Sequence, residues 1–310
     1  MKKNVQFTLL KLLMLVCALI LNFCFISCNQ NKVKAENSNN FESDNVSISK
    51  DLKDYWFSGK AEITSYELSQ NRYDENQTGK AVLIYVTEDF DHEKLVKTDT
   101  KKNEDYPVLK LNSTKDFTTG IYPYHIMQSA FLPIEKNNRA VKITSSIQEW
   151  CGQSYMQLEQ KNEQQTIQVN SYFQQIGNFS KNLDNFPTEN ALWLQLRLFP
   201  EQIDTTITSM IPSFEFLRLQ NQDIKAYRVN INQSKTNQLL KTQLYYPELK
   251  RHLVISQQTT PPFQIEAWEE KITRNDSNFI TTASKLSLLK IDYWNKNTNQ
   301  FSFLRDTLKL

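Results

Sequence analysis

The stretch KAVLIYVTEDF (residues 80–90) contains six consecutive apolar side chains, from Ala81 to Val86, before a polar segment begins. A short continuous apolar run bounded by polar residues is typical of a strand that is covered on both faces. Valine, isoleucine and tyrosine also favour a strand over a helix, because branched and aromatic side chains suit the pleated surface of a sheet. We therefore predict that this segment is a central strand, covered on both faces.

Most other segments alternate between apolar and polar residues. In VKITSSIQEW (residues 141–150), Ile143 and Ile147 fall on one face of a strand, and Thr144 and Ser146 fall on the other. This period of two is typical of antiparallel strands with one buried face. The same pattern occurs in YWFSGKAEI, QQTIQVNSYF, IKAYRVNIN, QLYYPEL, RHLVISQ and FQIEAWEEKIT, which begin at residues 55, 164, 224, 243, 251 and 263.

One segment, PTENALWLQLRLFPEQI (residues 187–203), predicts a helix. Thr188 is a suitable N-cap and Glu189 favours the first turn, while the leucines recur on one helical face. Pro200 ends or bends the helix. The last residues, NQFSFLRDTLKL (299–310), are compatible with a short terminal helix.

About a dozen strands around one helix predict a mainly β fold, either a large antiparallel curved sheet or an incomplete barrel with one central helix. Two stacked β-domains are the alternative. The order of the elements resembles that of the half-barrel lipoprotein carriers that shuttle lipids across the periplasm. This resemblance concerns the fold and does not by itself assign a function.

The first residues have the pattern of a bacterial export signal. Two lysines (Lys2 and Lys3) precede an apolar run that extends from Leu12 to Ile26, as in a signal peptide. FISC (residues 25–28) then resembles the lipobox of bacterial lipoproteins, in which a small residue precedes a cysteine that is acylated and becomes the mature N-terminus. A retained anchor and an ordinary secretory signal are the alternatives, although the run is short for a spanning helix.

The chain is therefore predicted to have three parts. Residues 1–27 form a lipoprotein signal peptide, and Cys28 is the lipidated residue. Residues 28–50 are polar and rich in asparagine and serine, which predicts a flexible tether because such a segment buries too little to become ordered. Residues 51–310 form a β-rich globular domain. The expected location is the bacterial cell envelope, as an outer-membrane lipoprotein that faces the periplasm.

Charge and cysteine content restrict the partners. The formal net charge of the chain is +2, and removal of a signal with three lysines and no acidic residue changes it to −1. This balance offers no basic field for the phosphates of a nucleic acid, so we expect no nucleic-acid partner. With Cys28 acylated, Cys151 is the one remaining cysteine of the mature chain, and no intramolecular disulfide can form.

Catalytic signatures such as GxSxG, HExxH and GxGxxG are absent, which favours a protein without catalytic activity. The weak candidates for catalysis are Cys151 as nucleophile, His125 as base and Glu149 as its orienting group. Tyr122, Tyr124 and Trp150 are weak candidates for ligand binding. The chain has three histidines, far apart in the sequence, so we expect no metal site and no cofactor.

Two further segments carry charged residues among aromatic ones. WEE places Glu269 and Glu270 on opposite faces of a strand, so they cannot act as an acid–base pair, and solvent or structural roles are favoured. In FEFLRLQ (residues 214–220), Arg218 alternates with aromatic residues. The guanidinium either faces inward or extends to the edge of the sheet, and the second arrangement is the commoner one.

Several stretches together resemble a family of uncharacterised Bacteroidetes-type lipoproteins that often carry the label septum formation inhibitor Maf. The resemblance covers most of the mature domain and implies an anchored envelope protein. The Maf label belongs to a cytoplasmic nucleotide pyrophosphatase family, whose Ser- and Arg-containing phosphate-binding stretch has no counterpart here. The stretches that carry the resemblance are WFSGKAEITSYEL, GKAVLIYVTEDF, PVLKLN, TGIYPYHIM, QEWCGQ and LRDTLKL.

We therefore expect a lipid-anchored envelope lipoprotein with a binding or assembly role. The membrane is reached through the N-terminal lipid, and the further partner is an apolar ligand or an envelope protein. An envelope hydrolase with a site around His125 and Cys151 is the alternative. The pyrophosphatase activity that the Maf label suggests ranks last.

Replacement of Cys28 by alanine tests the lipobox. The variant has no thiol at the lipobox position, so metabolic labelling with palmitate is expected to fall to background and the protein to leave the membrane fraction. Cys24→Ala is the matched control, because its bulky neighbour Phe23 makes it a poor lipobox cysteine. Palmitate retained by Cys28→Ala would contradict the assignment.

Overall fold

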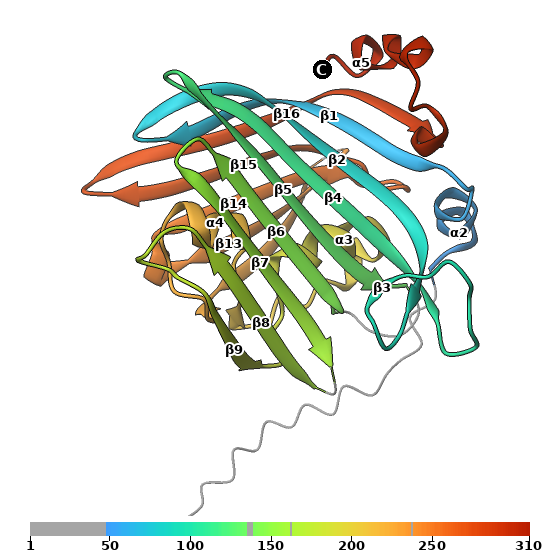
Figure 1. The fold of residues 1–310 in the computed structure, drawn as a ribbon, viewed down its shortest axis with the longest axis horizontal. Coiled ribbons are helices and arrows are strands. Elements are labelled where there is room, and N and C mark those ends of the chain that lie inside the picture. The colour runs from blue at the N-terminus through green and yellow to red at the C-terminus, as the bar shows by residue number, and fades with distance from the viewer. Residues whose placement is uncertain (1–47, 135–138, 162, 237) are drawn as a thin grey trace, which may run out of the picture. The chain divides into compact units, whose positions relative to one another are not determined.

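A sheet of 14 antiparallel strands, which does not close into a barrel, forms most of the protein (Figure 1). It belongs to a computed structural model that describes residues 48–134, 139–161, 163–236 and 238–310. The expected signal peptide, Cys28 and residues 29–47 of the expected tether lie outside the described residues. No helix in the described part of the chain is long and apolar enough to cross a membrane.

The strands follow one another across the sheet with few departures from sequence order. From one edge to the other, the order is β12-β13-β14-β15-β16-β1-β2-β4-β5-β6-β7-β8-β9, and β3 pairs with β2. The bounds are β1 Ala61–Arg72, β2 Glu75–Asp91, β3 Val96–Lys97, β4 Tyr106–Thr119, β5 Tyr122–Pro133, β6 Lys142–Glu149, β7 Gly152–Lys161, β8 Gln164–Ser171, β9 Phe179–Asp184, β12 Asn230–Thr236, β13 Leu239–Tyr246, β14 Arg251–Gln258, β15 Ile265–Arg274 and β16 Ser277–Ile291. A separate pair joins β10 (Ser209–Met210) to β11 (Tyr227–Arg228).

Few helices accompany the sheet. Among the described residues they are α2 Lys50–Trp56, α3 Glu189–Leu198, α4 Phe214–Leu219 and α5 Phe303–Thr307, with 3-10 turns η1 Pro200–Gln202, η2 Pro247–Leu249, η3 Tyr293–Asn295 and η4 Asn299–Phe301. The sheet curves over α3 and α4, which lie on its concave side (Figure 1). The predicted fold class, a large curved antiparallel sheet with a central helix, is confirmed.

The strand β2 is covered on both faces, as its continuous apolar run predicts. Leu83 and Tyr85 face the core that contains α3. Val82 and Val86 face outward and pack with Leu308, just after α5, in a second apolar cluster. The C-terminal segment therefore covers the outer face of the central strands, which explains why this strand lacks the alternation seen elsewhere.

The helix α3 forms where its sequence predicts it. The Thr188 hydroxyl caps the N-terminus by accepting a hydrogen bond from the Ala191 N–H, and the helix ends at Leu198, two residues before Pro200. The segment 214–220, for which the sequence predicts no element, folds as the helix α4. Its N-cap, Ser213, accepts a hydrogen bond from Phe216, and six residues are too few for periodicity to distinguish a helix from a strand.

Two buried ion pairs attach the ends of α3 to the sheet. Near its C-terminus, Arg197 Nη1 and Nη2 lie 2.7 and 2.8 Å from the carboxylate oxygens of Glu62 on β1. At its N-terminus, Glu189 pairs with Arg251 on β14 at 2.5 and 2.8 Å. Each fork-to-fork pair fixes both distance and orientation. The helix is therefore held in one position across the concave face.

Removal of the Glu62 carboxylate is expected to destabilise the fold strongly. Glu62→Ala leaves the guanidinium of Arg197, which is 1% exposed, without its counter-charge, and such changes cost about 3–5 kcal/mol. The free energy of unfolding in urea measures the effect. Glu67→Ala on the same strand is the control, because Glu67 is exposed; equal losses in the two variants would contradict the role of the pair.

Candidate functional site

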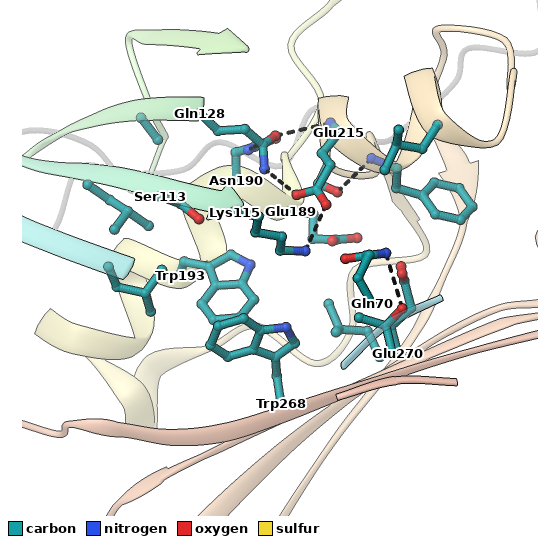
Figure 2. A pocket seen from close by; sticks show the side chains of 18 of the residues that line it. Gln70, Ser113, Lys115, Gln128, Glu189, Asn190, Trp193, Glu215, Trp268 and Glu270 are labelled. Atoms are coloured by element: carbon teal, nitrogen blue, oxygen red, sulfur yellow. Dashed lines mark hydrogen bonds and ion pairs between the residues drawn. The ribbon is translucent and has the colours of Figure 1, made fainter. Parts of the chain in front are cut away.

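A cavity lies between the concave face of the sheet and the helices α3 and α4 (Figure 2). The space open to the centre of a water molecule measures about 60 Å³, enough for a few water molecules or a small chemical group. Residues from seven strands and both helices line it: Gln70, Leu83, Leu111, Ser113, Lys115, Gln128, Ala130, Glu189, Asn190, Trp193, Ser213, Glu215, Phe216, Leu219, Gln220, Arg251, Leu253, Trp268, Glu270 and Thr281.

One polar network joins α4 to the strands β4 and β5. Lys115 Nζ lies 2.7 Å from Glu215 Oε1, and Gln128 Nε2 donates to Glu215 Oε2 at 3.1 Å. The Gln128 carbonyl oxygen accepts from Asn190 Nδ2 and from the Glu215 backbone N–H, both at 3.1 Å. Because each partner constrains the next, these side chains have fixed positions in the wall of the cavity.

A second network is centred on Arg251. Besides its pair with Glu189, Arg251 donates from Nε to Glu270 Oε1 at 2.5 Å, and Glu189 Oε2 also accepts from the Tyr246 hydroxyl at 3.0 Å. Burial raises the pKa of the Glu189 carboxyl, but the charge and hydrogen bonds of Arg251, with hydrogen bonds from Tyr246 and the Ser213 backbone, together lower it below its usual value. Glu189 is therefore ionised at neutral pH although it is buried.

Apolar and aromatic side chains form the rest of the wall. The indole rings of Trp193 on α3 and Trp268 on β15 meet edge to face, with centroids 5.4 Å apart. Figure 2 shows these rings beside the space into which Lys115 and Gln70 extend. A wall of two tryptophans next to fixed polar groups is typical of a site that orients a small ligand.

His125 and Cys151 do not form a nucleophile–base pair in the described structure. His125 pairs with Asp116, whose Oδ1 lies 2.6 Å from Nδ1, and both side chains are exposed. Cys151 is an exposed free cysteine in the turn between β6 and β7. No hydrogen bond of the described residues joins it to His125.

Glu149 contacts Cys151 and not His125. The Glu149 carboxylate accepts a hydrogen bond from the Cys151 backbone N–H at 2.7 Å. It also raises the pKa of the Cys151 thiol, first by accepting a hydrogen bond from the thiol and second by repelling the thiolate. An activated cysteine needs a lowered pKa, so this environment has the opposite effect.

The three aromatic candidates lie close together at one end of the sheet. The ring centroids of Tyr122 and Trp150 are 6.3 Å apart, and those of Tyr122 and Tyr124 are 5.9 Å apart. Tyr124 is buried and stacks on Phe117, whereas Trp150 is 68% exposed. None of the three lines the cavity.

Asp91, His92 and Asp105 form the one group of three potential metal ligands found among the described residues. The carboxylates of Asp91 and Asp105 already accept hydrogen bonds from backbone N–H groups. Asp91 accepts from the N–H groups of Glu93 and Lys94, and Asp105 accepts from those of His92 and Lys102. These bonds explain the buried carboxylates as turn-forming groups, so we assign no metal site here.

The cavity residues were not identified from the sequence, apart from Glu270, which was expected to have a structural or solvent role. One signal was available: Gln70, Lys115 and Gln128 occupy inward-facing positions of strands whose neighbours are apolar. Polar residues at core positions are costly unless they are satisfied or functional. The pattern did not show that these three positions converge.

No family model matches this chain, and no curated protein matches it either. Fold and site therefore define the class of protein directly. It is a half-barrel protein, with a small internal cavity between an open antiparallel sheet and the two helices that the sheet covers.

Glu149→Gln is expected to activate the Cys151 thiol. Loss of the negative charge lowers the pKa, so more thiolate is present at pH 7 and alkylation by iodoacetamide becomes faster. At a pH well above the thiol pKa the two proteins should react at the same rate. Glu159→Gln, on the neighbouring strand β7, is the control, and an unchanged rate at pH 7 for Glu149→Gln would contradict the assignment.

Proposed function

We propose that the protein is a lipid-anchored cell-envelope protein that binds a small ligand in the cavity under its half-barrel. The lipobox-like sequence supports the proposed location in the cell envelope. The single observation that carries the binding role is the cavity itself, in which two fixed polar networks and two tryptophans surround an open space. A core built for stability alone would be filled at this place, because empty space in a core is destabilising.

The size and chemistry of the cavity restrict the ligand. About 60 Å³ open to water centres has room for a small group and too little for an acyl chain. The walls carry five charged side chains beside the apolar ones: Lys115, Glu189, Glu215, Arg251 and Glu270. The ligand we propose is therefore a small molecule with polar groups, or the polar end of a longer one.

An envelope protein partner is a second candidate, favoured by exposed apolar side chains at one end of the sheet. Ile121 is 82% exposed, Trp150 68% and Tyr172 75%. They lie in the turns after β4, β6 and β8, and alternate turns of an up-and-down sheet share one end. Exposed apolar groups that gather in one place are typical of interaction surfaces.

Filling the cavity tests the binding role. Ser113 faces the cavity from β4. The phenyl ring of Ser113→Phe is expected to occupy the space, so the amount of bound small molecule should fall at least about tenfold. The measurement is mass spectrometry of small molecules and proteins that co-purify with the native, anchored protein. Neighbouring Thr114→Phe points to the other face and is the control.

Two results would contradict the proposal. One is the same amount of bound small molecule in Ser113→Phe and in the unchanged protein. The other is the absence of any small molecule from all three proteins, with an envelope protein recovered from each in its place. The second result would favour the partner role of the exposed apolar end.

A further inference from the structure

We propose that the cavity binds the primary ammonium group of a small organic ligand, with Gln70 Oε1 and Glu270 Oε2 as its acceptors. This inference rests on the proposed binding function and names the class of ligand. Both acceptors belong to the sheet side of the cavity (Figure 2). Three features carry the inference: an unpartnered buried acceptor, an unbalanced negative charge and the row of residues that joins them.

Gln70 supplies the unpartnered acceptor. Its side chain is only 3% exposed, and its carbonyl oxygen is buried without a hydrogen-bonding partner. The amide orientation follows from the other end, because Nε2 donates to Asn71 O at 3.1 Å and to Thr281 Oγ1 at 3.2 Å. If the amide were reversed, the side-chain oxygen of Gln70 would lie against the backbone carbonyl oxygen of Asn71. The free oxygen therefore requires a donor.

The charge of the cavity wall is unbalanced by one negative unit. Lys115 balances Glu215, and Arg251 is shared between Glu189 and Glu270. Both oxygens of Glu189 are engaged. Glu270 uses Oε1 for Arg251, and no hydrogen bond of the described residues reaches its Oε2. The uncompensated charge therefore lies at Glu270, which favours a cationic ligand.

Strand pairing places the two acceptors in one row. Glu270 on β15 pairs with Thr281 on β16, and the Thr281 hydroxyl accepts from the Gln70 side chain and from the Asn71 N–H of β1. Residues paired across neighbouring strands share a face and lie about 5 Å apart. Gln70 and Glu270 thus flank Thr281 on the concave face, and both line the cavity.

The remaining wall suits an ammonium group on a short carbon chain. Trp193 and Trp268 line the same cavity, and the face of an indole ring attracts a cation. An ammonium has three N–H donors, so it can satisfy both acceptors and keep one further bond. A carboxylate would meet Glu270 and Gln70 with no donor to offer.

Calorimetric titration with small probes tests the inference on the mature, lipid-anchored protein in detergent at pH 7. Ethanolamine carries the ammonium group, ethylene glycol is its neutral counterpart and glycolate is the anionic one. Ethanolamine is expected to bind about tenfold or more tightly than either, as a charge-assisted hydrogen bond requires. Equal binding of ethanolamine and ethylene glycol, tighter binding of glycolate or no binding of ethanolamine would overturn the inference.

Two variants locate the probe. Glu270→Gln and Gln70→Met are each expected to weaken ethanolamine binding about tenfold, and thermal unfolding verifies that both are folded. Glu269→Gln is the matched control, because Glu269 is the adjacent carboxylate on the outer face of β15. Ethanolamine affinity that is unchanged in folded Glu270→Gln, or equally reduced in Glu269→Gln, would overturn the assignment of the site.

The failure of this inference is distinguishable from that of the proposed function. If Ser113→Phe loses a native ligand and that ligand is neutral or anionic, the cavity is a binding site and the ammonium assignment is wrong. If Ser113→Phe binds ethanolamine as tightly as the unchanged protein, ligand binding in the cavity is itself wrong.

Discussion

The two arginine–glutamate pairs that attach α3 to the sheet are the constraint on which the rest of the structure depends. Glu189 lies at the N-terminus of the helix and Arg197 in its last turn, where each charge is favourable to the helix dipole. The sheet supplies the opposite charge at both places, Arg251 and Glu62. Since buried charges tolerate no loss of a partner, the helix cannot slide or rotate on the concave face.

The cavity is a consequence of this attachment. Arg251 serves Glu189 and also Glu270, so the residue that fixes the helix also places an acidic group in the wall beside it. The sheet curves over α3 and α4 (Figure 1), and residues of both helices line the cavity beneath it. This space is open and lined by polar groups in fixed positions, which is a costly arrangement unless a ligand uses it.

The fold was predictable because most β segments carry their own alternation, β2 carries a continuous apolar run, and α3 carries its own cap. Ile143, Ile147 and Leu192 are buried as their patterns indicate. The helix α4 was missed because its six residues are too short for a reliable period. The functional candidates were chosen for unusual composition, and composition led to Cys151 and Trp150 at an exposed turn. Apart from Glu270, the cavity residues lie in stretches of ordinary composition and were not identified as a site.

The sequence by itself determined which face of each strand is buried, because that property depends on neighbours within a few residues; on the same local basis it predicts an export signal and a lipobox-like cysteine. Only the tertiary structure decided that Gln70 and Glu270, 200 positions apart in the chain, flank Thr281 in one row. Alternation in the sequence predicts the face of a strand on which a residue lies. Whether residues from different strands lie near one another depends on which strands are neighbours and in what register they pair. That register is set by long-range packing, and it turned isolated inward-facing polar residues into a single site.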